Sequence, residues 1–245
     1  MRIVYGLTAA TLLAACGGGG SDNIAAPTGS PAAPVAGAAA PAGSAWVDKV
    51  EQTAEGGFRM GNPDAPIKLI EYGSRTCGHC AAFATTAMEG LKGYVASGKV
   101  SFEFRDFLLN PIDLGAALLG QCAGPGAFFA IMDQMYAQQA EILKNAPQDE
   151  AFAKQIEAMP PQQRVVALAE RFGYLSFVQE RGVPEAQARA CLTDQAKVQA
   201  LVKSNEDAAK QYSIPGTPTF ILNGKVLENT GTWPQVEAAL KQAGA

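Results

Sequence analysis

The segment IKLIEYGSRTCGHCAAF, residues 67–83, carries two cysteines three positions apart, shortly after an apolar run. The run ends at Gly73 and has the length and composition of a buried strand. Apolar residues then recur at helical spacing beyond the second cysteine, and Gly98 stands where such a helix would end. The segment therefore predicts a strand followed by a helix, with Cys77 and Cys80 at the junction.

Strand patterns also occur further along the chain. Residues 100–107, VSFEFRDF, alternate apolar and polar side chains with the period of two that is typical of a strand. Residues 218–227, PTFILNGKVL, predict a β-hairpin, because Asn223-Gly224 between two apolar runs favours a type I′ turn. A last helix is expected over residues 233–242.

The block between these strands, about residues 112–212, is expected to be helical. Prolines divide it into helix-length segments: Pro111, Pro125, Pro147, Pro160, Pro161 and Pro184. Because strands on both sides of the block complete one sheet, we expect a single α/β domain over residues 46–245. The helical block is then an insertion into that domain.

The bulk composition agrees with one folded body and limits its partners. Of the 245 residues, 48% are hydrophobic and 17% are charged, so a globular domain is expected rather than a disordered chain. The formal net charge is −4, and no run of Lys or Arg occurs in the sequence. Both observations argue against binding to nucleic acid.

The N-terminus has the features of an export signal. Residues 1–15 combine an early arginine with an apolar stretch that is too short to span a bilayer. Their last three residues and Cys16 form LAAC, residues 13–16, which resembles the bacterial lipobox and implies lipidation of Cys16; an ordinary cleaved signal is the alternative. Residues 16–45 are rich in Gly, Ala, Pro and Ser and predict a flexible tether. The chain is therefore expected on the periplasmic side of a bacterial membrane, and Gly17 favours the outer membrane.

The CGHC segment is compatible with several kinds of site. A zinc site needs about four ligands, but the single histidine lies inside the pair and Cys122 has no CxxC partner. Covalent haem attachment requires a histidine directly after the second cysteine, where this chain has Ala81. A static disulfide would be unusual at a strand-to-helix turn. A redox-active pair is favoured, and no metal or organic cofactor is expected.

The start of a helix suits redox chemistry at the first cysteine. Free backbone N–H groups and the helix dipole stabilise an anion there, so the pKa of Cys77 should be lowered. Cys80, one turn later, is placed to attack a mixed disulfide and release the substrate. His79, when protonated, would add positive charge near the thiolate; the alternative is a merely solvated residue.

Taken together, these segments resemble the thioredoxin superfamily and, within it, the DsbA-like branch of exported thiol–disulfide oxidoreductases. The resemblance rests on IKLIEYGSRTCGHCAAF, VSFEFRDF, the helical insertion and IPGTPTFILNG, and it extends from about residue 57 to the C-terminus. It implies a thioredoxin-like core with an inserted helical subdomain. Many bacterial members have Pro-His between the cysteines, whereas Gly78-His79 is typical of protein disulfide isomerase. This difference bears on how oxidising the protein is.

The resemblance also implies roles outside the CGHC segment. Thr217-Pro218 is expected to be a cis peptide beside the cysteines. The proline would leave nearby backbone free to pair with an extended substrate. Glu71 stands where the family carries a buried acid that can relay protons; a glutamate facing water is the alternative. Reoxidation by a quinone-linked membrane protein of the DsbB type is implied as well.

Cys122 and Cys191 form a second pair within the helical block. Free buried cysteines are common, but one leftover pair in an exported protein favours a structural disulfide. Such a bridge would stabilise the insertion by constraining the unfolded chain.

We therefore expect a periplasmic, lipid-anchored thiol–disulfide oxidoreductase. It would act as a dithiol oxidase on reduced or misfolded exported polypeptides, with Cys77 as the nucleophile and Cys80 as the resolving thiol. The segment before the core has no apolar periodicity that could form a dimerisation domain, which favours a monomer and an oxidase. A disulfide isomerase or reductase, and a chaperone-like binding module, are the alternatives.

Overall fold

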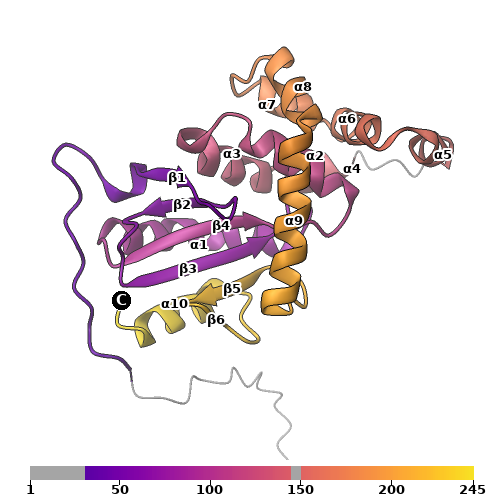
Figure 1. Cartoon of the computed structure of the whole chain (residues 1–245). Helices are drawn as coiled ribbons and strands as arrows, with labels where there is room; N and C mark the ends of the chain where they lie inside the picture. Colours follow the sequence, from indigo (N-terminus) through magenta and orange to yellow (C-terminus); the bar gives the residue numbers. More distant parts are fainter. Residues whose placement is uncertain (1–30, 145–149) are drawn as a thin grey trace, which may run out of the picture.

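The computed structural model describes residues 31–144 and 150–245 (Figure 1). The expected signal peptide, the lipidation site at Cys16 and the first part of the expected tether lie outside these residues. Within the two described ranges, no helix has the length and apolar character needed to cross a membrane.

A six-stranded mixed sheet forms the centre of the fold (Figure 1). Its order is β1-β2-β4-β3-β5-β6, with β1 (Val50–Gln52), β2 (Phe58–Gly61), β3 (Ile67–Gly73), β4 (Val100–Asp106), β5 (Thr219–Leu222) and β6 (Lys225–Val226). Strands β3 and β4 are parallel, and the other neighbouring strands are antiparallel. Helix α1 (Gly78–Ala96) connects β3 to β4, so these elements form the predicted βαβ unit.

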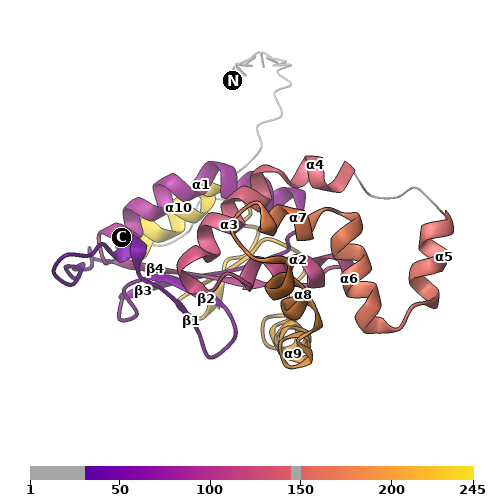
Figure 2. The same ribbon diagram turned by 90° about the horizontal axis from the view of Figure 1, so that it is seen from above.

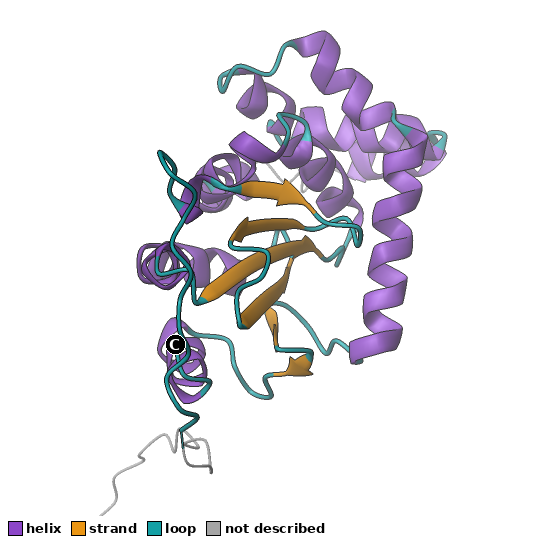
Figure 3. Ribbon diagram, turned by 60° about the vertical axis from the view of Figure 1, so that its left-hand side comes forward, coloured by secondary structure: helices purple, strands orange, loops and turns teal. Residues whose placement is uncertain are grey.

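Helices cover both faces of this sheet (Figures 2 and 3). On one face lie α1, α3 (Pro125–Ala137) and α10 (Trp233–Gln242), which share a core with buried strand residues such as Phe102 and Phe220. The long helix α9 (Gln195–Tyr212) crosses the other face, where Ala208 packs with Ile221. The junction of β3 and α1 therefore belongs to a three-layer body, and its α/β class agrees with the prediction.

The insertion between β4 and β5 is helical and has a core of its own. It consists of α2 (Pro111–Gln121), α3, α4 (Gln139–Lys144), α5 (Glu150–Ala158), α6 (Pro161–Arg171), α7 (Tyr174–Gln179), α8 (Glu185–Thr193) and α9. Buried residues such as Leu119, Tyr174 and Leu192 fill this second core. Helices α5 and α6 extend away from the sheet, whereas α3 and α4 lie next to α1 (Figure 2). The insertion thus borders the N-terminal end of α1 and its CGHC segment.

Two features of the sheet differ from what the sequence indicates. The hairpin of β1 and β2 at one edge was not predicted, because both strands are short and carry little alternation. In β4, the polar residues Ser101 and Glu103 are buried together with the apolar ones, since β4 is a central strand covered on both faces. The predicted type I′ turn is confirmed by positive φ angles of 48° at Asn223 and 82° at Gly224.

The described part of the N-terminal segment lies against the folded body. Backbone hydrogen bonds join Ala32 to Gln242 and Val35 to Gly244, and the Trp46 indole donates to the carbonyl oxygen of Ala38 over 2.7 Å. Val35 and Trp46 also pack against the core under α1. This part of the expected tether is therefore in contact with the domain.

Candidate active site

Cys77 occupies the N-cap position of α1, shortly after the end of β3. Its Sγ accepts a hydrogen bond from the backbone N–H of Cys80, at an N···Sγ distance of 3.4 Å. When it is protonated, its thiol donates to the carbonyl oxygen of Thr217, which lies 3.1 Å from the sulfur. Both cysteines are free; Cys77 is partly exposed, and Cys80 is fully buried. The structure thus shows a reduced pair in which one residue is accessible from solvent.

The pKa values of the two thiols shift in opposite directions. The hydrogen bond with the Cys80 side chain is the largest cause that lowers the pKa of Cys77 to about 5. Burial opposes this shift, and the Thr217 side chain and the backbone N–H groups of Cys80 and His79 add to it through hydrogen bonds. Burial raises the pKa of Cys80, and the hydrogen bond with Cys77 and the charge of Glu71 raise it further. At neutral pH the accessible sulfur is a thiolate and the buried sulfur is a thiol.

Glu71 in β3 is only 2% exposed, so it does not face water. Burial and the negative charge of Cys77 raise the pKa of its carboxyl group to about 8, with Arg75 acting in the opposite direction. Its Oε1 has no hydrogen-bond partner among the described residues. A carboxyl group with this pKa is able to hold or release a proton near neutral pH.

The Thr217-Pro218 peptide bond is cis and directly precedes β5. A cavity of about 380 Å³ lies beside it, lined by Pro215, Pro218, His79 and the connection from β6 to α10. His79 is exposed at this cavity. It lowers the Cys77 pKa through its backbone N–H, whereas the sequence had suggested an effect of imidazole charge. The cavity gives a bound chain room next to the reactive sulfur.

The helical insertion holds the loop that leads into CGHC. Asp113 in α2 accepts hydrogen bonds from Ser74 Oγ at 2.9 Å and from the backbone N–H of Thr76 at 3.0 Å. Asn110, the N-cap residue of α2, donates from Nδ2 to Thr76 Oγ1 over 2.8 Å. These contacts were not predicted from the sequence, although Asn110-Pro111 followed by an acidic residue is a helix-start signature.

Two more residues of the insertion donate to backbone carbonyl groups of the same loop. The Tyr136 hydroxyl in α3 donates to Ser74 O over 3.1 Å. Gln139, the first residue of α4, donates from Nε2 to Arg75 O at 2.9 Å and to Cys77 O at 3.0 Å. Nothing in the sequence around Gln139 indicates this contact.

Arg75 anchors the loop from within the core. It is 1% exposed, and its Nε lies 2.6 Å from Oδ1 of Asp106 at the end of β4. The guanidinium group also lies over the rings of Phe104 and Phe128, each centroid 5.1 Å away. Gln121 donates to the second carboxylate oxygen of Asp106. The buried ion pair thus connects the residues before CGHC to the neighbouring strand.

A family model described as thioredoxin matches residues 53–242, which include the CGHC segment, the insertion and the cis proline. The chain belongs to the thioredoxin family. Its predicted α/β fold with a thioredoxin-like core is thereby confirmed.

Relatives within the thioredoxin family agree with the predicted DsbA-like branch. The crystal structure of a protein-disulfide isomerase from Novosphingobium aromaticivorans is 31% identical with a TM-score of 0.73, over 77% of this chain and 97% of that one. The Wolbachia pipientis alpha-DsbA1 structure shares the fold, with 21% identity and a TM-score of 0.57 over 75% and 89% of the two chains. A Rickettsia bellii protein, named provisionally as a protein-disulfide oxidoreductase, is 27% identical over 171 residues. That match covers 69% of this chain but only 58% of the relative's length.

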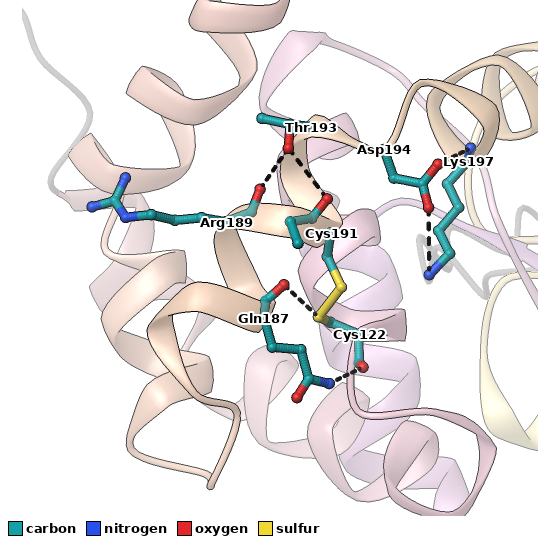
Figure 4. Close-up of a disulfide and its surroundings, with 8 residues drawn as sticks. Cys122, Gln187, Arg189, Cys191, Thr193, Asp194 and Lys197 are labelled. Carbon is teal, nitrogen blue, oxygen red and sulfur yellow. Dashed lines mark hydrogen bonds and ion pairs between the residues drawn. A yellow bond between two sulfur atoms is a disulfide. The ribbon is translucent and has the colours of Figure 1, made fainter.

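A disulfide joins Cys122, directly after α2, to Cys191 in α8 (Figure 4). The two residues are 69 positions apart in sequence. Gln187 donates from Nε2 to the carbonyl oxygen of Cys122 over 3.0 Å. Both bridged cysteines belong to the core of the insertion, whereas Cys80 belongs to the core under α1. The two cysteine pairs therefore occupy separate parts of the fold.

Proposed function

We propose that this chain is a thiol–disulfide oxidoreductase that introduces disulfides into exported polypeptides through Cys77 and Cys80. One observation carries the proposal: the accessible sulfur of Cys77 lies at the N-cap of α1 and accepts a hydrogen bond from the backbone N–H of Cys80, whereas Cys80 itself is buried. This geometry agrees with a Cys77 pKa lowered to about 5 and a raised pKa of Cys80. A stabilised thiolate makes the reduced enzyme the more stable form, and its disulfide is then the stronger oxidant. DsbA is a strong oxidant for this reason, because its reduced form is stabilised.

The oxidase reaction transfers two electrons from the substrate to the enzyme. A substrate thiolate attacks Sγ of Cys77 in the Cys77–Cys80 disulfide, and Cys80 leaves as a thiolate that takes up a proton. A second substrate thiolate then attacks the substrate sulfur of the mixed disulfide and expels Cys77 as a thiolate. The substrate gains a disulfide, and the enzyme becomes a dithiol. The low pKa of Cys77 favours its departure in this second step.

Glu71 is proposed to exchange the proton that this reaction requires at Cys80. Its charge contributes to the raised pKa of Cys80, so the two groups are electrostatically coupled. A carboxyl pKa of about 8 allows Glu71 to change protonation as the charge on the cysteines changes.

The proposed substrates are reduced, extended polypeptides. The cavity beside Pro218 has the space for a chain segment, and the proline at the start of β5 leaves one backbone position without an N–H donor. An extended segment can pair with the backbone next to Pro218 while its cysteine lies at Cys77. No cofactor is required, because the sulfur atoms carry the electrons.

The cellular setting is proposed from the sequence. A lipid on Cys16 would hold the chain at the periplasmic side of a membrane, with the outer membrane favoured by Gly17. A quinone-linked membrane protein of the DsbB type would accept two electrons from the Cys77–Cys80 dithiol and restore the disulfide. We propose that the chain acts as a monomer.

Disulfide isomerisation is the second candidate function. The name of the Novosphingobium aromaticivorans protein supports it, because that structure is called a protein-disulfide isomerase. The Gly78-His79 pair points in the same direction. In this reaction the Cys77 thiolate attacks a non-native disulfide of the substrate and forms a mixed disulfide. The released substrate thiolate attacks another disulfide of the same substrate, and the thiolate set free there attacks the mixed disulfide and expels Cys77. The number of disulfides in the substrate is unchanged, so no net electrons are transferred.

Refolding of a model protein from two starting points separates these functions. The reduced substrate receives oxidised enzyme, and the scrambled substrate receives an equal amount of reduced enzyme, which carries the Cys77 thiolate. We expect rapid disulfide formation in the fully reduced substrate and a smaller effect on the scrambled one. Rapid recovery of native disulfides in the scrambled substrate, without disulfide formation in the reduced one, would favour the isomerase function. A Cys77→Ser, Cys80→Ser double variant that still complements loss of the protein in cells would instead favour a chaperone-like binding module.

A further inference from the structure

Gln139 is the residue of the insertion whose side chain donates to the backbone of Cys77 itself. It is 6% exposed, and its Nε2 lies 3.0 Å from Cys77 O and 2.9 Å from Arg75 O. An amide nitrogen carries two hydrogens, so each carbonyl can accept one of them. Gln139 thus bridges the two carbonyl groups on either side of Thr76.

These two carbonyl groups belong to the last residues before α1, which begins at Gly78. Cys77 O also accepts the first hydrogen bond of the helix, from the backbone N–H of Ala81. Arg75 O, in contrast, has no donor besides Gln139 in the described part of the chain. A buried carbonyl without a donor is unfavourable, so the backbone would move to find one if the Gln139 amide were lost.

Such a movement would act directly on the reactive sulfur. The pKa of Cys77 depends on hydrogen bonds with the side chains of Cys80 and Thr217 and with backbone N–H groups at the start of α1. Sulfur hydrogen bonds of 3.1 Å to Thr217 O and 3.4 Å from Cys80 N define its position. Hydrogen bonds weaken steeply when their geometry changes.

The other contacts from the insertion act further from the sulfur. Tyr136 donates to Ser74 O, and Asp113 accepts from Ser74 and Thr76. They hold the loop in place, but they do not reach Cys77.

We propose that Gln139 is a positioning residue for the Cys77 thiolate, through which the helical insertion sets the acidity of the active-site sulfur. The inference rests on the proposed function and extends it, because it gives the insertion a part in the chemistry. Gln139 does not touch a substrate or the reacting atoms; it acts through the carbonyl groups of Arg75 and Cys77.

The experiment compares Gln139→Met with Gln138→Met. Methionine has a similar length and volume but donates no hydrogen bond, and the exposed neighbour Gln138 supplies the same chemical change away from the loop. Each protein is reduced at Cys77 and Cys80, and its alkylation rate is measured against pH. Cys77 dominates this rate, because Cys80 is fully buried and its pKa is raised.

We expect the alkylation midpoint of Gln139→Met to rise by about one pH unit or more, a tenfold change in thiol acidity. The glutathione equilibrium of the variant should shift toward the disulfide form, because its thiolate is less stabilised. Gln138→Met should match the wild type in both measurements. Gln139→Asn keeps an amide on a shorter side chain that cannot reach both carbonyls, so an upward shift is expected there too.

An unchanged midpoint in Gln139→Met or Gln139→Asn, whichever folds, would overturn the inference. Loss of folding in both variants would also overturn it, because Gln139 would then be a purely structural residue. Failure of the proposed function would instead be visible in the wild type, as a normal Cys77 pKa or as absent disulfide exchange.

Discussion

The sulfur of Cys77 lies 3.1 Å from the carbonyl oxygen of Thr217, although 140 residues separate the two along the chain. Strand pairing brings them together, because β5 is antiparallel to β3 with Thr219 opposite Tyr72. The helical insertion lies entirely between the two contact residues in sequence. Two elements therefore fix the position of the reactive sulfur: the start of α1 and the residues before β5. The pairing of β5 with β3 holds these residues beside α1.

The pKa of Cys77 should depend on the hydrogen-bonding capacity of residue 80. The Cys80 side chain is the largest cause that lowers the Cys77 pKa to about 5. We expect Cys80→Ala to raise the Cys77 pKa more than Cys80→Ser does, because serine retains a donor. Thiolate absorbance against pH measures both variants. Equal pKa values in the two variants would show that the side chain of residue 80 does not stabilise the thiolate.

Glu71→Gln should make the reduced protein more stable at pH 8 than the wild type. The carboxyl pKa is raised from 4.5 to about 8 in the folded state, so the wild type loses stability as pH rises through this window. The glutamine side chain does not ionise, so the variant does not lose stability in this way. The pH-dependent difference in the free energy of unfolding between variant and wild type should reach about a few kcal/mol at pH 8 and vanish below pH 4.5. Urea unfolding at several pH values measures it.

Glu89→Gln, at an exposed position of α1, is the matched control for this experiment. It should unfold like the wild type at each pH. A Glu71→Gln protein whose stability follows the wild-type pH profile would contradict the raised pKa of Glu71.

Asp106→Asn should destabilise the protein by about 3–5 kcal/mol, because it leaves Arg75 charged and buried without its ionic partner. Asp207→Asn is the matched control, since Asp207 pairs with Lys203 at the surface, where both side chains are more than half exposed. Its loss should cost about 1 kcal/mol or less. Denaturant unfolding compares the two. If both variants lost only about 1 kcal/mol of unfolding free energy, the buried Arg75–Asp106 pair would contribute little to the stability of the fold.

Removal of the second disulfide should affect stability and leave the active site unchanged. Bridges that close loops of this kind stabilise proteins by about 2–4 kcal/mol, and this one spans 69 residues. We expect the Cys122→Ser, Cys191→Ser variant to lose stability of that order while it retains the wild-type Cys77 pKa. A large change in the Cys77 pKa would show that the bridge and the active site are coupled.

The sequence predicts the local parts of this site better than its long-range contacts. Periodicity and turn residues indicate β3, α1, the hairpin at Asn223 and the helical block, because these signals arise from neighbouring residues. A family resemblance suggested the cis bond at Pro218 and the buried acid at Glu71. The thiolate position at a helix start followed from Cys77 itself.

Contacts from the insertion could not be predicted in the same way. Gln139 has a polar side chain in a helical segment, and such residues are usually exposed. Its burial depends on how α4 packs beside α1, which no local pattern specifies. The burial of Arg75 likewise depends on Asp106 and two phenylalanine rings from other elements. The backbone N–H of His79 contributes to the lowered pKa of Cys77, which the sequence did not indicate; the expected effect of the imidazole charge stays a prediction.

The equilibrium of Cys77–Cys80 with glutathione tests the central claim most directly. The measurement uses the protein with its second disulfide intact and follows the fraction oxidised against the ratio of reduced to oxidised glutathione. A stabilised Cys77 thiolate predicts an oxidising pair, with a potential of about −180 mV or less negative, in the range of protein disulfide isomerase and DsbA. A potential near the thioredoxin value of about −270 mV would contradict the account, because the pair would then donate electrons to its substrates.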